Sequence, residues 1–251
     1  MNFNELNSHT RDHNIDFNQK AHIYTIFGQE YLSVTSLINQ FFPQFNTQYW
    51  AEKKAQRLGV SPESLLEEWR QKGEAASIQG TLLHSNIEKH LLGEVHGEEG
   101  AFPLYLKFRK DHPTLLPYRT EWAIYDEEYE IAGTIDLLES HGGKYDMYDW
   151  KCSTKLLSDN GSIIKEHHFH ETGLQPITHL DNTPYHHYAL QQSMYRYILE
   201  KNYNIPLRSC SLVVLHPNYK NYHIIKLPYL YKEVKAMLDK YKQGKRIFPV
   251  P

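Results

Sequence analysis

The stretch Ala132–Ser153, which reads AGTIDLLESHGGKYDMYDWKCS, constrains the fold of this chain more than any other. Two runs that alternate apolar with polar residues flank His141-Gly142-Gly143, a pattern that predicts a β-hairpin. In such a hairpin Asp136, Asp149 and Lys151 lie together at one end, because Lys151 follows Asp149 by two residues and shares its face. Buried carboxylates need compensation, and a divalent metal ion provides it. The alternative is an exposed strand whose charged groups simply meet water.

The surrounding patterns predict a mixed α/β domain, with a central β-sheet that contains an antiparallel meander and is flanked by helices. The expected strands are 22–27, 30–33, 120–126, 130–139, 145–151, 210–215 and 222–227. The expected helices start at Ser33 and then cover 47–58, a segment from Ser61 onward, 80–92, 102–110, 185–201 and 230–241, with Gly244 just past the last one. We expect residues 1–20 to be a polar N-terminal segment, poorly ordered at its start, and residues 21–251 to form one domain. A long loop at 155–185, rich in histidine, is expected to be functional or mobile.

Composition excludes several classes of protein. No run is long and apolar enough to span a membrane, and the polar N-terminus lacks the apolar core of a secretory signal, so we expect a cytoplasmic location and no membrane partner. The two cysteines, Cys152 and Cys210, offer neither a disulfide framework nor an iron–sulfur cluster. The net charge is −3, but residues 61–140 hold 16 acidic and 7 basic residues (−9), whereas residues 201–251 hold 2 and 10 (+8). This asymmetry permits a polyanionic substrate without requiring one.

The acids and the lysine of the hairpin match the needs of phosphodiester hydrolysis. Carboxylates hold hard divalent cations, which activate water and stabilise charge on the phosphoryl oxygens, and a nearby lysine adds positive charge. The motif D-x-K at Asp149–Lys151 is weak on its own. The segment Gly133-Thr134-Ile135-Asp136, one hairpin earlier, makes the pattern considerably more specific.

The pairing of GTID with DWK resembles the core of the PD-(D/E)xK nuclease superfamily. More narrowly, it is similar to the branch that contains the RecB nuclease domain, lambda-type exonucleases and the mitochondrial genome maintenance exonuclease. Two further motifs of that branch follow in the expected order: G-x-x-x-H-x-x-x-E at Gly80, His84 and Glu88, and Q-x-x-x-Y at Gln191 and Tyr195. The stretch Tyr24–Phe42 also resembles the N-terminal part of such nucleases, so that the resemblance covers roughly residues 20–230.

The resemblance implies a restriction-endonuclease-like core and a DNA nuclease that depends on Mg²⁺ or Mn²⁺, an exonuclease acting on single strands or duplex ends. It implies metal ligands at His84, Asp136, Asp149 and the backbone carbonyl of Trp150, with Asp136, Asp149 and Lys151 catalytic. Gln191 and Tyr195 would bind the DNA backbone. Glu88 and Glu121 are second-tier candidates, because both could equally be salt-bridge partners. The second acid is Asp149 where the superfamily more often has Glu.

Other readings stay open at this point. A non-catalytic nucleic-acid-binding protein could keep the same fold, and an RNA-directed nuclease would use the same residues. His84 alone could be an ordinary helix histidine, and Gln191 with Tyr195 a surface pair. The histidines at 167, 168, 170, 186 and 187 could form a separate metal site, although clustered loop histidines are more often solvated.

Overall fold

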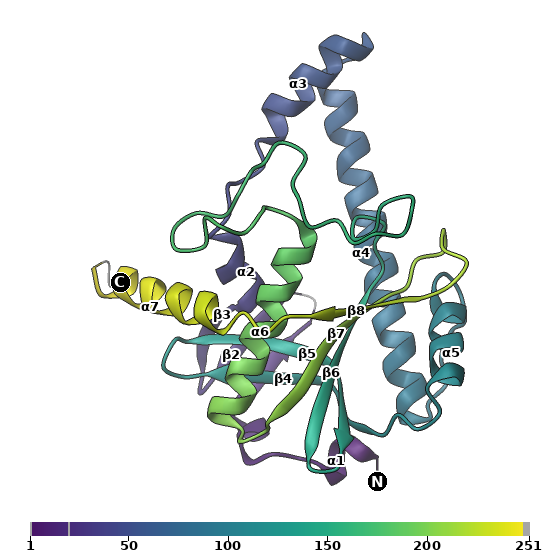
Figure 1. Cartoon of the computed structure of the whole chain (residues 1–251), viewed down its shortest axis with the longest axis vertical. Helices are drawn as coiled ribbons and strands as arrows, with labels where there is room; N and C mark the ends of the chain where they lie inside the picture. Colours follow the sequence, from purple (N-terminus) through teal and green to yellow (C-terminus); the bar gives the residue numbers. More distant parts are fainter. Residues whose placement is uncertain (1, 20, 248–251) are drawn as a thin grey trace.

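A mixed β-sheet forms the centre of the molecule (Figure 1). The computed structural model describes residues 2–19 and 21–247, and within them eight strands form one sheet in the order β1-β2-β3-β5-β6-β7-β8, with β4 on the free side of β5. The strands are β1 (Ile15–Asn18), β2 (Ile23–Ile26), β3 (Gln29–Ser33), β4 (Pro117–Asp126), β5 (Ile131–His141), β6 (Lys144–Lys151), β7 (Leu207–Val214) and β8 (His223–Leu227). The expected meander is β4-β5-β6, antiparallel throughout, whereas β3–β5 and β6–β7 are parallel pairs.

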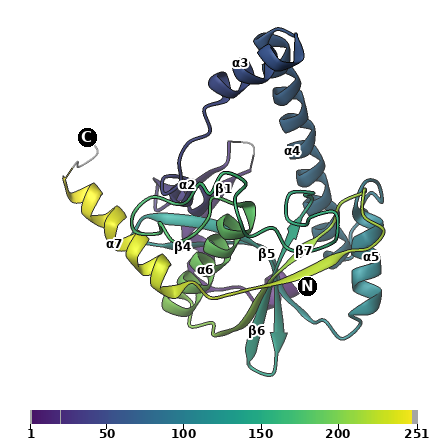
Figure 2. The ribbon, with the colours of Figure 1, turned by 45° about the horizontal axis from the view of Figure 1, so that its top comes forward.

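Helices cover both faces of this sheet, which confirms the α/β class (Figures 1 and 2). They are α1 (Phe3–Leu6), α2 (Val34–Asn39), α3 (Thr47–Leu58), α4 (Pro62–Leu92), α5 (Phe102–Asp111), α6 (Pro184–Asn202) and α7 (Tyr231–Ile247), with a 3-10 turn at Thr10–Asn14. On one face, α2, α6 and α7 share a buried cluster with the sheet residues Ile135 and Met147. On the other, the second half of α4 and α5 enclose Trp150 with Leu83 and Phe108. Burial of these apolar faces is the main force that holds the layers together.

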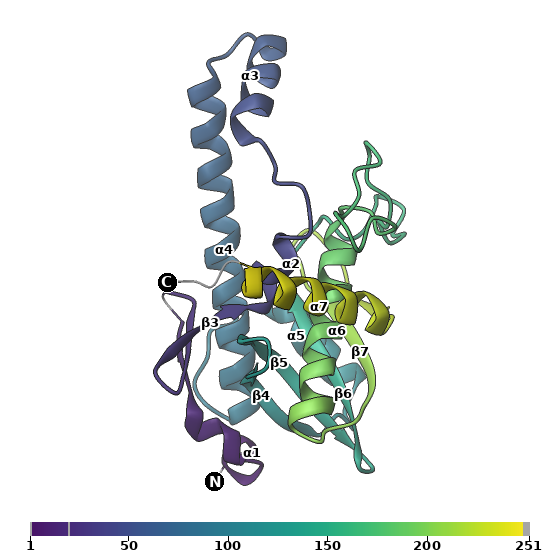
Figure 3. The ribbon, with the colours of Figure 1, turned by 90° about the vertical axis from the view of Figure 1, so that its left-hand side faces the viewer.

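Helix α4 differs from the expectation of two separate helices. It runs unbroken for 31 residues from its Ser61 cap, through Gly73 and Gly80, to Leu92. Glycine in a helix interior costs only about 1 kcal/mol relative to alanine, so two glycines weaken this helix without ending it. Its first half stands away from the sheet and pairs with α3, which gives a projecting helical hairpin (Figure 3). The same correction applies to α7, because Gly244 lies inside that helix.

The N-terminal residues 2–19 are folded onto the sheet, so the expectation of a poorly ordered polar segment is wrong for them. Asp12 is the anchor: its carboxylate accepts hydrogen bonds from Arg119 Nη1 at 2.7 Å and from the indole N–H of Trp122 at 2.8 Å. The short elements begin with capping boxes at Asn2 and His9. These polar interactions give no apolar periodicity, which explains why the pattern of the sequence did not reveal them.

Between β6 and α6 the chain runs through residues 152–183 without a helix or strand, tied together by the isolated bridges Leu157↔Ile163 and Thr172↔Asp181. Among the described residues, no helix combines the length and the apolar character needed to cross a membrane.

Candidate functional site

The site lies where β5 passes from one neighbour to another. Along one edge β5 pairs with β4, while along the other edge it pairs first with β3, at Ile131 and Ala132, and later with β6, from Leu137 onward. Residues 133–136, the GTID motif, belong to neither of these two ladders. The strands β3 and β6 diverge at this motif, and the open edge gives space for a cleft.

Three carboxylates occupy one row across this opening. The β4–β5 register puts Glu121 opposite Asp136, and one step beyond the last β5–β6 pair Asp149 lies on the other side of Asp136. The amide N–H of Trp150 donates to Asp136 Oδ2 at 2.8 Å, which fixes that carboxylate between the strands. Asp136 is 7% exposed and Asp149 only 3%, so bulk water solvates neither carboxylate well.

Glu121 has a left-handed backbone, with φ of 46° in the middle of β4. A residue with a Cβ rarely adopts this conformation, which costs of the order of 1 kcal/mol or more. Glu121 and Asp136 are absent from the β4–β5 ladder, although the pairs on either side of them keep the register, so the strand is locally opened at this point. The result is that the Glu121 side chain reaches the cleft.

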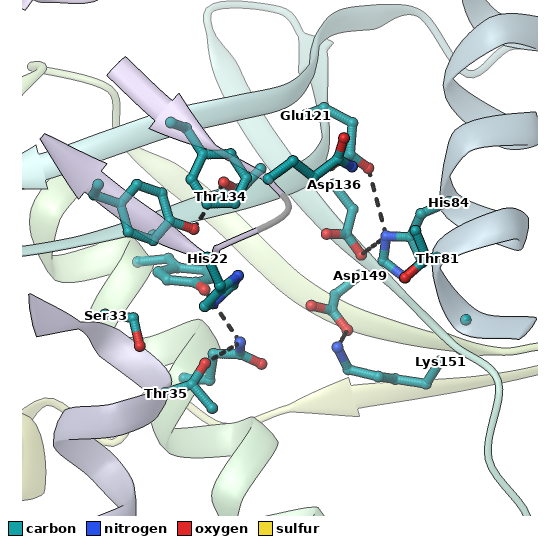
Figure 4. A pocket seen from close by; sticks show the side chains of 17 residues that line it. His22, Ser33, Thr35, Thr81, His84, Glu121, Thr134, Asp136, Asp149 and Lys151 are labelled. Carbon is teal, nitrogen blue, oxygen red and sulfur yellow. Dashed lines mark hydrogen bonds and ion pairs between the residues drawn. The ribbon is translucent and has the colours of Figure 1, made fainter. Parts of the chain in front are cut away.

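His84 comes to the same point from α4 (Figure 4). Its Nδ1 lies 3.4 Å from Glu121 Oε1 and 3.5 Å from Asp136 Oδ2. Its Nε2 lies 3.0 Å from the carbonyl oxygen of Trp150. A carbonyl can only accept, so Nε2 carries a proton and Nδ1 is the nitrogen turned toward the acids. In this arrangement the Trp150 carbonyl orients the histidine, a different role from the metal ligand that the resemblance implies.

Lys151 and Asp149 form a second, adjacent unit. Lys151 Nζ lies 2.6 Å from Asp149 Oδ2 and 4.6 Å from the centre of the Tyr188 ring. The other oxygen of Asp149 accepts a hydrogen bond from Gln192 Nε2 at 2.8 Å. Asp149 is thus held between a cation and an amide, and it keeps Lys151 directed along the cleft.

Burial and neighbouring charges shift the pKa values of these groups in opposite directions. Burial raises the pKa of Asp149 to about 6 although Lys151 opposes the change, and burial likewise raises the pKa of Asp136. For His84 burial favours the neutral ring, but the charges of Asp136 and Glu121 outweigh it and raise the pKa to about 9. Burial also disfavours the charge on Lys151, yet Asp149 and Asp136 raise its pKa above the usual value. The cluster therefore attracts positive charge.

Gln191 and Tyr195, one turn apart on α6, close the cleft on the side opposite α4. Gln191 Nε2 donates to Thr35 Oγ1 at 3.2 Å and to the Tyr195 hydroxyl at 3.1 Å. The Tyr195 ring fills the space above Gly133, where an added Cβ would come within 2.4 Å of Tyr195 Cε1. Gly133 is therefore needed for close contact between β5 and α6, so two of the motifs seen in the sequence touch each other.

The residues present suit a divalent cation. Ligand atoms of His84, Glu121 and Asp136 all lie within 4.8 Å of one another. Among the described residues, the buried Glu121 Oε1 has no hydrogen bond of regular geometry and only the 3.4 Å ion pair with His84 Nδ1, which leaves lone-pair capacity for a metal ion. Carboxylate oxygens and one imidazole form a ligand set that hard divalent metal ions accept.

The structure thus reorders the expected site residues. His84, Asp136, Asp149, Lys151, Gln191 and Tyr195 all line one cleft of about 300 Å³. Glu121 joins the prospective ligands, whereas Glu88 is not among the residues that line the cleft. The sequence reasoning missed Gln192, the partner of Asp149; its only signal was its position next to Gln191. It also missed Phe17, from the N-terminal segment, which lines the cleft.

A second hollow of about 480 Å³ adjoins the first. It shares three lining residues with the cleft, Thr35, Lys151 and Gln191, and extends to His187 and Asn182 at the edge of the long loop. Lys151 thus lines both hollows.

No known family model matches the chain, and no curated protein sequence matches it significantly.

Proposed function

We propose that this chain is a divalent-metal-dependent nuclease of the PD-(D/E)xK superfamily that hydrolyses phosphodiester bonds in DNA. The observation that supports the proposal is the convergence of His84, three carboxylates and Lys151 in one open cleft. The core would be restriction-endonuclease-like, and Mg²⁺ or Mn²⁺ would be held by His84, Glu121 and Asp136. We further propose exonuclease action on single strands or duplex ends, in the cytoplasm.

The residues have distinct tasks in this proposal. When bound, a divalent cation lowers the pKa of a water molecule and supplies positive charge beside the phosphate. The Lys151 ammonium stabilises the negative charge that develops on the phosphoryl oxygens, a contribution that is large in a site partly shielded from water. Asp149 orients that ammonium at 2.6 Å, and Gln192 holds Asp149 in turn. Gln191 and Tyr195 border the path of the sugar–phosphate backbone.

A cleavage assay tests the proposal. End-labelled single strands, duplexes and closed circles are incubated with Mn²⁺ or Mg²⁺, with and without EDTA, and RNA strands are run in parallel. We expect metal-dependent cleavage of DNA with free ends. Lys151→Ala should lose about 10²–10³-fold in rate, the range found when a charge-stabilising group is removed. Lys144→Ala, at the exposed far end of the same strand, is the matched control and should cleave normally.

Each outcome has a meaning. If wild type and Lys151→Ala both fail to cleave every substrate, the proposal that the protein is a nuclease is wrong. DNA binding in EDTA without cleavage after metal is restored would support a non-catalytic binding protein. Cleavage of RNA in preference to DNA would change the substrate class, and cleavage of closed circles would replace exonuclease by endonuclease action.

A further inference from the structure

A cluster of aromatic rings lies away from the cleft, where the α3–α4 hairpin meets the long loop. It consists of Phe45, Trp50, Trp69 and Phe169, and we name it the distal aromatic cluster. These rings line a hollow of about 460 Å³. The first residue precedes α3, the next two lie on α3 and α4, and Phe169 comes from the loop, so three separate segments of the chain build the hollow.

Three of the four rings of this cluster are exposed to solvent. Phe45 is 65% exposed, Trp50 40% and Phe169 73%. The planes of Trp50 and Phe45 lie 5° apart with centres at 6.5 Å, and those of Trp50 and Phe169 lie 20° apart with centres at 5.9 Å. Nearly parallel exposed rings are an arrangement on which flat ligands stack.

Positive charge surrounds the same rings. Lys53, Lys54 and Arg57, all from α3, line the hollow, and Lys54 Nζ lies 5.4 Å from the centre of the Trp69 ring. In the described part of the chain none of these three cations forms an ion pair with a carboxylate. Glu171 is the one acid among the lining residues. The hollow therefore suits a ligand that joins flat apolar groups to negative charges.

Unpaired nucleotides have this chemistry, because each base stacks on a ring while its phosphate meets a lysine or arginine. A second copy of this chain or another protein would need an apolar surface, for which three cations beside the rings are a poor match. The charges thus favour a single strand of nucleic acid as the occupant.

The hollow also lies near the space that adjoins the cleft. The neighbouring space beside Lys151 ends at Asn182, whose backbone N–H donates to the Glu171 carbonyl at 2.7 Å, and Glu171 lines the distal hollow. Along α4, Trp69 and His84 are 15 residues apart, or about 22 Å at about 1.5 Å per residue. With about 3.4 Å per stacked nucleotide, roughly six nucleotides span this distance.

We propose that the distal aromatic cluster binds unpaired nucleotides of the strand whose phosphodiester lies in the cleft, about six nucleotides from the bond that is cut. The proposal rests on the nuclease function for the part of the strand in the cleft, but the binding itself needs no cleavage. The proposal predicts that a single strand binds to the distal aromatic cluster without a divalent metal ion. It also predicts that a strand too short to reach from the cleft to the cluster binds more weakly.

Tryptophan fluorescence gives a direct binding readout. Trp122 and Trp150 are 2% and 1% exposed, so quenching by an added strand reports on Trp50 and Trp69. Oligothymidylates of about 4 and about 12 nucleotides are titrated in EDTA, with a 12-base-pair duplex for comparison. We expect quenching by the single strands, tighter for the longer one, and salt-dependent affinity.

Variants then separate the cluster from the rest of the surface. Phe169→Leu together with Trp50→Leu should weaken binding of the 12-mer by roughly 5- to 150-fold, the range for loss of one stacked base. Phe27→Leu, an equally exposed ring outside the cluster, is the matched control. Lys53→Glu with Lys54→Glu should weaken binding and flatten its salt dependence, whereas exposed Lys232→Glu should do neither.

Cleavage rates distinguish this proposal from the nuclease proposal itself. With Mn²⁺, the double leucine variant should cut a 4-mer as wild type does and a 12-mer more slowly. Equal binding and equal cleavage by variant and wild type would overturn the proposed cluster even if the protein is a nuclease. Quenching by the strand without any cleavage would overturn the nuclease and leave the cluster standing. A change of oligomeric state in the variant, with unchanged strand binding, would assign the rings to contact between copies and overturn the proposal.

Discussion

Glu121 shows how a single residue can determine a site. Its left-handed backbone interrupts β4 and directs a carboxylate toward His84, 3.4 Å away, where the buried Oε1 has this long ion pair but no hydrogen bond of regular geometry among the described residues. Strain and an unsatisfied buried oxygen both cost free energy, so their coincidence points to a ligand that offsets the cost.

Replacement of this carboxylate tests its place among the ligands. Glu121→Gln keeps the shape of the side chain but removes its charge, and we expect Mn²⁺ affinity to fall by about 10-fold or more, with cleavage lost in proportion. Calorimetric titration of Mn²⁺ into the protein measures the affinity. Glu88→Gln, one turn beyond His84 on α4, should bind Mn²⁺ as wild type does; if it is the more damaged variant, the ligand set proposed from the structure is wrong.

His187 gives a pH-dependent contribution to stability. Burial, with help from the neighbouring His186, lowers its pKa from 6.5 to about 4, and its ring stacks on Phe42 while Nε2 lies 2.8 Å from Asn182 Oδ1. The unfolded chain takes up the proton at a higher pH than the folded chain. The stabilising contribution of the neutral ring is therefore complete above about pH 6.5 and is lost as the pH falls toward 4.

Denaturant unfolding between pH 4 and pH 7 measures this contribution. When the pH is lowered from 7 to 4, the free energy of unfolding should decrease in both proteins. We expect the decrease to be about 2 kcal/mol smaller in His187→Gln than in wild type. Glutamine preserves a donor to Asn182, so the comparison isolates the titration. His168→Gln, in the exposed loop, should keep the wild-type dependence, and identical pH profiles for wild type and His187→Gln would show that the buried ring does not titrate in this way.

Among the helices and strands, the sequence predicted those features that depend on residues close together in the chain. The alternation of apolar and polar residues and the Gly142-Gly143 turn predicted the meander β4-β5-β6. Gly59, which has φ of 68°, predicted the C-terminal end of α3. Two helix boundaries are wrong: Gly80 does not begin a second helix but lies inside α4, and Gly244 does not follow α7 but lies inside it. What the sequence could not reveal depends on contacts between distant segments: the place of Glu121 across the sheet, the hold of Gln192 on Asp149, and the folding of Asp12 onto β4.

The two glycines of α4 separate the stability of the helix from its contribution to the cleft. An added Cβ meets no atom within 4 Å at either Gly73 or Gly80, and only Gly80 lines the cleft, one turn before His84. Gly73→Ala and Gly80→Ala should each stabilise the protein by about 0.5–1 kcal/mol, since alanine is the better helix former.

Cleavage should distinguish the same pair. Under the proposed function, the Gly80→Ala methyl group would narrow the cleft that holds the substrate, so we expect a lower kcat/KM for this variant and an unchanged value for Gly73→Ala. Thermal unfolding and initial cleavage rates measure the two effects. Equal activity of both variants would mean that Gly80 provides no clearance for the substrate.

The molecule as a whole depends on its first residues to complete both the sheet and the cleft. Strand β1 extends the sheet beyond β2, and Phe17 from β1 lines the cleft. Asp12 fastens this segment to β4, where burial alone would raise its pKa but the hydrogen bonds from His9, Trp122 and Arg119 lower it. Arg119 is 8% exposed, so removal of Asp12 leaves a buried cation with only the Asn7 carbonyl and the Trp122 ring as partners and with no carboxylate.

Asp12→Ala is therefore expected to act far beyond its own position. The free energy of unfolding should fall by about 2–4 kcal/mol, because Arg119 and the indole N–H of Trp122 both lose the Asp12 carboxylate as their hydrogen-bond acceptor. Denaturant unfolding followed by the fluorescence of buried Trp122 measures the loss, and exposed Asp16→Ala on β1 is the matched control. If the N-terminal segment only covers the sheet, stability falls but cleavage by the folded fraction stays normal. If it also shapes the cleft through Phe17, KM rises in Asp12→Ala while metal affinity is unchanged, and this second result is the one that the position of Phe17 leads us to expect.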